Sequence, residues 1–173
     1  MKFLTTTACE SYAKRLGPRK DVLDHRKLRA LKKKIDLAYC SRLKNARVVA
    51  EAVVSFLGDF ASALLWTHGL VWGDRTEEPA APQDWIRYGQ WRAALGATAS
   101  LSVLPGQLFD PSERAELAEG IEWTIYTGSD AIVIPQPTRT IIHLSHDDLI
   151  SVHCRSTPNR LHVLEELGLR RMG

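Results

Sequence analysis

The chain has 173 residues, of which 45% are hydrophobic and 25% are charged, and its net charge is +3. This length favours a single compact domain, and the balance of apolar and charged residues excludes an intrinsically disordered chain. The three cysteines are too few and too irregularly spaced for a disulfide framework or a zinc knuckle. We therefore expect free thiols and a cytoplasmic protein.

Membrane and secretory classes are not favoured. The first twelve residues contain only a very short apolar stretch, well below what a secretory signal requires. The most apolar segment, residues 48–66, contains Glu51, Gly58 and Asp59 and is shorter than the roughly 20 clean apolar residues of a membrane span. A buried helix is the better interpretation, and we expect no membrane partner.

Charge is distributed very unevenly along the chain. Residues 13–47 contain thirteen Lys or Arg against three Asp, which gives this segment a net charge of +10 and leaves −7 from residue 48 onward. Such asymmetry predicts either a basic arm that meets a polyanion or a basic element that is neutralised by the acidic remainder or by a partner.

In chain order, the first predicted elements are helical. A short helix is expected at residues 10–16, and a long basic helix begins near Asp21, because apolar residues then recur at helical spacing. In such a helix one face would carry Arg26, Arg29, Lys33, Lys44 and Arg47. Residues 46–70 continue this pattern, either as the same helix bent near Gly58 or as a second helix.

The middle of the chain contains one loop and two further predicted helices. Residues 73–83 combine Gly, Asp, Glu and two prolines, which indicates an exposed loop or hinge. A helix from Asp84 to about Gly96 follows. Another helix, ending at Tyr126, should start at Asp110 and Pro111 as cap and first-turn residues, with Glu113 completing a capping box.

The last quarter changes to short β-branched runs, which predict two or three antiparallel strands, and then to a C-terminal helix from about Asn159. The predicted fold class is α+β: a helical N-terminal two-thirds packed with a small antiparallel sheet or hairpin at about 131–154 and a C-terminal helix. We expect one domain, 1–173, with a possible division into a basic helical part, 1–72, and an α+β part, 84–173, joined by loop 73–83.

Two surfaces are candidates for binding. The basic face could follow phosphates without reading sequence, because no helix-turn-helix, zinc-finger or RNP pattern accompanies it; a solvated or internally paired surface is the alternative. The second candidate is the helix that carries Trp85, Tyr88 and Trp91 beside two arginines, since these residue types dominate binding hot spots. Core packing is the alternative for these aromatic residues.

A histidine cluster near the C-terminus supplies metal-ligand residue types. In a simple hairpin that pairs residue 143 with residue 150, His143 and His153 would point to opposite sides of the strands, and Cys154 would lie about 13 Å along the strand from the partner of His143. This spacing fits no established zinc pattern, and His143 cannot activate Cys154. We predict no metal site and no catalytic residue.

The sequence therefore favours a non-enzymatic cytoplasmic interaction, regulatory or inhibitor protein that docks on a protein or nucleoprotein partner and uses no cofactor. One alternative is a sequence-tolerant nucleic-acid-binding protein that uses the basic helix at 14–47. A second alternative is a metal-dependent enzyme built on His143, His146 and His153. The oligomeric state stays open.

Overall fold

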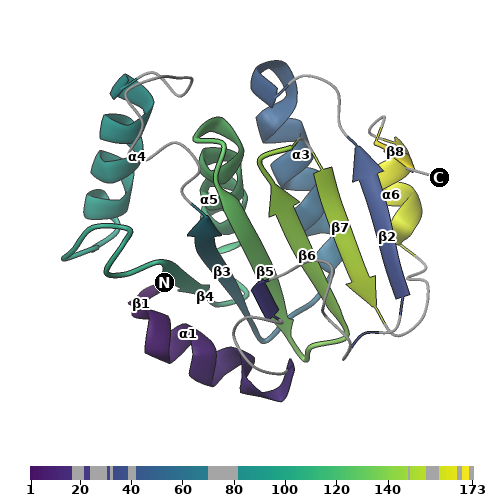
Figure 1. The fold of residues 1–173 in the computed structure, drawn as a ribbon, viewed down its shortest axis with the longest axis horizontal. Coiled ribbons are helices and arrows are strands. Elements are labelled where there is room, and N and C mark those ends of the chain that lie inside the picture. Colours follow the sequence, from purple (N-terminus) through teal and green to yellow (C-terminus); the bar gives the residue numbers. More distant parts are fainter. Residues whose placement is uncertain are drawn as a thin grey trace.

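The computed structural model describes residues 1–16, 22–23, 31, 33–38, 42–69, 82–147, 149–154, 160–166 and 169–171. In these residues a single antiparallel sheet runs through the molecule, with the strand order β1-β4-β3-β5-β6-β7-β2-β8 (Figure 1). The strands are β1 Lys2–Leu4, β2 Lys33–Ala38, β3 Ser62–Gly69, β4 Gly106–Phe109, β5 Asp130–Gln136, β6 Thr140–Ser145, β7 Leu149–Cys154 and β8 Arg170–Arg171. The helices are α1 Thr6–Ala13, α3 Arg42–Leu57, α4 Pro82–Ala94, α5 Arg114–Tyr126 and α6 Leu161–Glu166, and a 3-10 turn, η1, covers Lys14–Leu16.

The predicted fold class is wrong, because the sheet is not confined to residues 131–154. Strands β1 to β4 come from the part of the chain that was expected to be helical. The sheet also mixes the two halves of the sequence: β3 lies between β4 and β5, which come from the other side of the predicted loop at 73–83. Both parts of the suggested division therefore contribute strands to one sheet.

The helix expected at 46–70 ends at Leu57, and residues 62–69 form β3 instead. Gly58 has φ +65°, a left-handed conformation that stops a helix and that glycine adopts without steric cost. In β3, residues 63–67 are all buried, because both faces of this central strand are covered. A strand buried on both faces shows no polar alternation, so its apolar run resembles a buried helix.

The long basic helix expected from Asp21 is also wrong, because residues 33–38 form β2. Ile35 and Leu37 are buried in the core that lies under α3, whereas Lys34 and Asp36 are on the opposite face of the strand. This alternation has a period of two, as in a half-buried strand. The apolar residues fit a helical spacing only when residues outside the strand are added to them.

Several predicted elements are confirmed: α4, α5, α6 and the strands β5, β6 and β7 lie in the expected segments. The first helix begins earlier than expected, because α1 covers Thr6–Ala13 and η1 covers the rest of the segment predicted at 10–16. The expected cap of α5 is misplaced, however. Asp110 caps a turn before the helix, where its Oδ1 accepts a hydrogen bond from the Ser112 amide at 2.8 Å, and the helix itself begins at Arg114. The contact that defines the predicted capping box is present, because the Glu113 carboxylate accepts from the Asp110 amide at 2.9 Å, but it closes the turn that precedes α5.

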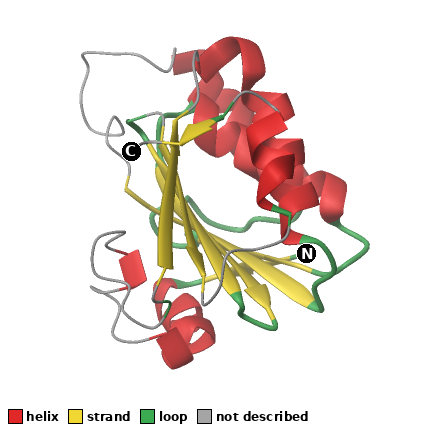
Figure 2. Ribbon diagram, turned by 90° about the vertical axis from the view of Figure 1, so that its right-hand side faces the viewer, coloured by secondary structure: helices red, strands yellow, loops and turns green. Residues whose placement is uncertain are grey.

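The sheet has two different faces, and Figure 2 shows helices on both sides of it, most of them on one side. On the first face, α3, α5 and α6 cover the larger apolar core. On the second face, α1 covers only part of the sheet, where Cys9 and Ala13 pack against Leu64, Trp66 and Ile132. None of the described helices is long and apolar enough to cross a membrane.

Candidate ligand-binding site

A cavity of about 260 Å³ lies on the second face of the sheet. Most of its described lining is polar, and all of the lining residues except Leu23 come from β2, β3, β5, β6, β7 and the turn between β6 and β7. The lining residues are Leu23, Lys34, Asp36, His68, Asp130, His143, Leu144, Ser145, His146, Asp147, Leu149 and Ser151. Ionisable groups are expensive to remove from water, so their concentration in one hollow marks it as the candidate site.

A row of polar residues crosses three neighbouring strands under this cavity. Asp36 of β2 lies opposite Ser151 of β7, and Ser151 lies opposite His143 of β6. The Ser151 hydroxyl donates a hydrogen bond to Asp36 Oδ1 at 2.5 Å, and the Lys34 ammonium donates to Asp36 Oδ2 at 2.8 Å. Ser151 and His143 are each only 4% exposed, so the floor of the cavity is polar although it is buried.

His68 reaches the cavity from an irregular point in β3. Thr67 pairs with Ala131 and Gly69 pairs with Asp130, so the register shifts and His68 is the extra residue. Leu64 and Trp66 of the same strand face this side of the sheet, so the alternation along β3 also directs His68 to it, and its imidazole lines the edge of the cavity.

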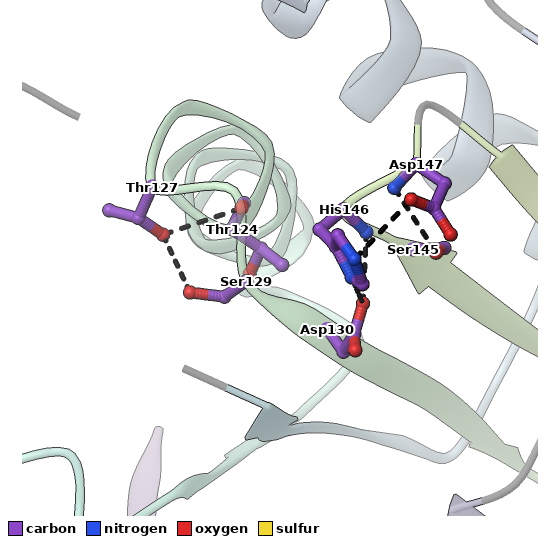
Figure 3. Close-up of polar contacts among 7 residues, drawn as sticks. All are labelled: Thr124, Thr127, Ser129, Asp130, Ser145, His146 and Asp147. Atoms are coloured by element: carbon purple, nitrogen blue, oxygen red, sulfur yellow. Dashed lines mark hydrogen bonds and ion pairs between the residues drawn. The ribbon is translucent and has the colours of Figure 1, made fainter. Parts of the chain in front are cut away.

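The rim is formed by an Asp–His–Asp group (Figure 3). Asp130 Oδ1 lies 2.9 Å from both the backbone nitrogen and the ring Nδ1 of His146. His146 Nε2 lies 3.3 Å from Asp147 Oδ1, and the Asp147 side chain is 68% exposed. The double contact with Asp130 holds the imidazole in place, as carboxylates do for many functional histidines.

The end of α5 fixes the position of Asp130. The Thr127 hydroxyl donates to the Trp123 carbonyl at 2.9 Å. It also lies 2.9 Å from the Ser129 hydroxyl (Figure 3). Gly128 adopts φ +59° between these two residues. These contacts complete the turn from α5 into β5, so the first residue of the strand enters at a defined point of the rim.

The register predicted for the histidine hairpin is wrong by one residue. His143 pairs with Ser151 and not with residue 150. Because side chains alternate along a strand, a shift of one residue places every side chain of one strand on the opposite face of the sheet relative to its partner strand. His143 and His153 therefore share a face, with ring centroids 4.9 Å apart, and Cys154 lies on the opposite face in the main core.

The described histidines do not form a metal centre. His146 lies in the turn, beside Asp130, whereas His143 and His153 are within the strands. Among the described residues, no group of three or more His, Cys, Asp or Glu side chains could hold a metal ion.

The basic residues that were expected to share one helix face do not do so. Arg26 and Arg29 lie outside the described residues. Lys33 is in β2, whereas Lys44 and Arg47 are in α3. For Lys33 and Lys44 only the backbone is described. Arg47 donates to Glu51 at 2.6 Å and to Glu122 at 3.3 Å. Its charge is thus met by carboxylates of the same chain.

The aromatic residues of α4 divide between core and surface. Tyr88 is 2% exposed, and its ring lies 5.8 Å from those of Trp91 and Trp123. Its hydroxyl accepts a hydrogen bond from the Gln107 amide at 3.1 Å. Tyr88 is therefore a core residue that attaches α4 to α5, whereas Trp85 and Trp91 are half-buried.

Asp36, His68, Asp130 and Ser151 line the cavity but were not predicted as site residues. A signal was present in β2 and β7, where polar residues alternate with apolar ones. Comparison with protein-family models, with curated proteins and with solved structures finds no match to this chain. The assignment of a site therefore depends on its geometry.

Proposed function

We propose that this protein binds a small polar organic molecule in the cavity on the second face of its sheet. The observation that carries this proposal is a hollow of about 260 Å³ toward which five elements direct seven described ionisable side chains. Small-molecule sites are concave and use a few well-placed polar groups, and their volumes are typically about 300–1,000 Å³. The volume of this cavity lies just below that range, which suits a compact ligand.

The Asp130–His146 pair adds a chemical capacity to this proposal. With Nδ1 held by Asp130 at 2.9 Å, the ring nitrogen that remains for a ligand is Nε2. Asp147, the present neighbour of Nε2, is mostly exposed and can rotate toward solvent. A bound molecule could then exchange a proton with Nε2, as in other carboxylate–histidine pairs.

Ligand-observed NMR with a set of small polar fragments tests the proposal. In the variant Ser151→Leu the larger side chain fills the cavity floor, so the fragments that bind the wild type should no longer bind. The control Ser55→Leu changes an exposed residue of α3 and should keep binding. Circular dichroism checks that both variants fold, and His146→Gln provides a second cavity variant at the turn. Equal binding to the wild type and to both cavity variants would refute the proposal.

A second candidate is the interaction protein that the sequence favours, and an observation on α4 supports it. Ile86 is 59% exposed and Arg87 has a 65% exposed side chain, and both lie next to the half-buried Trp85. Exposed apolar residues beside Trp and Arg are typical of binding surfaces. In a low-salt pull-down, the variant Ile86→Glu should no longer recover the partner. The control Val48→Glu, which changes an exposed apolar residue of α3, should still recover it. If the wild type recovers no specific macromolecule, this candidate function is wrong.

A further inference from the structure

We infer that the ligand of this cavity is a small organic cation with N–H donors, such as an amine or an amidine, attached to an apolar body. This inference rests on the proposed function and specifies the class of molecule. Its basis is the distribution of charge around the cavity and the hydrogen-bonding state of Asp130.

Two of the three carboxylates in the described lining share one imidazole. Lys34 is paired with Asp36 at 2.8 Å, so these two charges cancel. Asp130 and Asp147 both contact His146, at 2.9 Å and 3.3 Å. Even a protonated His146 supplies only one positive charge against these two carboxylates, so the Asp130–His146–Asp147 group keeps a net negative charge.

Asp130 also has room to accept a donor from a ligand. Both hydrogen bonds from His146 go to Oδ1. No donor from the described residues reaches Oδ2, and the side chain is 25% exposed. A carboxylate oxygen at the edge of a partly buried cavity attracts a charged N–H group, because charge-assisted hydrogen bonds are stronger than neutral ones.

The remaining lining limits the shape of the ligand. Leu23 and Leu149 provide apolar surface in the lining of the same cavity. An anion bound at the Asp–His–Asp group would face Asp130 and Asp147, whose two negative charges exceed the one positive charge that His146 can supply, and this disfavours it. A bare metal cation does not fit, because the described side chains do not converge on one point. The combination favours an organic cation with an apolar portion.

Three probes of nearly identical shape separate charge from size: benzamidinium, benzamide and benzoate. Their binding can be followed by ¹H–¹⁵N NMR of the histidine side chains. We expect benzamidinium to shift the His146 signals and to bind at least about tenfold more tightly than benzoate, the size of effect that one charge-assisted hydrogen bond gives. Benzamide should lie between the two.

Matched variants locate the effect. Asp130→Asn should weaken benzamidinium binding about tenfold or more and leave benzamide binding nearly unchanged. Asp147→Asn changes a mostly exposed side chain, so it tests the charge even if the first variant disturbs the fold. Asp59→Asn, at an exposed position before β3, should change neither affinity.

The outcomes distinguish this inference from the function on which it rests. If benzoate binds at His146 as tightly as benzamidinium, or if both cavity Asp variants bind benzamidinium normally, the ligand is not a cation, although a binding cavity still exists. The same holds if none of the three probes binds while other polar fragments do. If no fragment of any charge binds in the cavity, both the inference and the proposed function fail.

Discussion

Arg114 joins the end of α3 to the beginning of α5. Its guanidinium donates hydrogen bonds to the carbonyls of Gly58 at 2.7 Å and Val54 at 2.8 Å, and it lies 5.1 Å from the centre of the Phe60 ring. Val54 lies in the last turn of α3 and Gly58 directly follows the helix, where carbonyls lack an intrahelical donor and positive charge is favourable. One side chain thus satisfies the end of the helix that covers the main core.

Replacing this side chain should be costly for stability. Arg114→Met removes two charged hydrogen bonds and should lower the free energy of unfolding by about 1.5–3 kcal/mol. Arg87→Met, at a side chain that is 65% exposed on α4, should change it by less than about 0.5 kcal/mol. Urea titrations followed by circular dichroism provide both values. Similar stabilities for the two variants would show that Arg114 does not cap α3.

At the level of elements, two glycines have opposite roles. Gly58 ends α3 with φ +65°, and a methyl group there would also overlap the Arg160 guanidinium. Gly89 lies in α4, where an added Cβ would have no neighbour within 4 Å in the described structure. The same substitution should therefore act in opposite directions at these positions.

Gly58→Ala should destabilise the protein by about 1–2 kcal/mol, because an alanine pays the steric cost of the left-handed conformation. Gly89→Ala should stabilise it by about 0.5–1 kcal/mol through higher helix propensity. Thermal unfolding measures both changes. The assigned end of α3 would be wrong if Gly58→Ala were as stable as the wild type.

The elements also show how far the sequence could predict this fold. Residues 114–126 and the strands between 130 and 154 were predictable, because the Asp110–Pro111 start signal and the β-branched runs agree with the helix and the strands that these segments form. Strand β3 was not, because its burial on both faces removes the alternation that identifies a strand. The cavity was harder still: Asp36 and Ser151 are 115 residues apart and meet only because β2 pairs with β7. Nothing local in either strand specifies that pairing.

For the molecule as a whole, stability should fall at alkaline pH because of a buried thiol. Cys9 is fully buried between α1 and the sheet, and this burial raises the pKa of its thiol to about 12. In the unfolded chain a cysteine ionises above about pH 8.5. Between these two pKa values the unfolded chain releases the thiol proton, whereas the folded protein retains it. The stability that is present below about pH 8.5 is therefore lost progressively as the pH rises toward 12.

The unfolding free energy should therefore decrease between about pH 9 and 11, by at most about 1.4 kcal/mol per pH unit for this group. Cys9→Ala should have a shallower dependence over the same range. Tyr12, whose pKa is also raised by burial, contributes in the same direction in both proteins and cancels in the comparison. Parallel pH profiles for the wild type and Cys9→Ala would contradict this account.

We propose the polar cavity on the second face of the sheet as the binding site of this protein. A crystal structure of the protein soaked with the strongest-binding fragment tests it most directly. We predict density for the fragment in the cavity, within hydrogen-bonding distance of Asp130 or His146. A fragment bound on α4 or on the helical face, or a cavity filled by side chains of the protein itself, would contradict the claim.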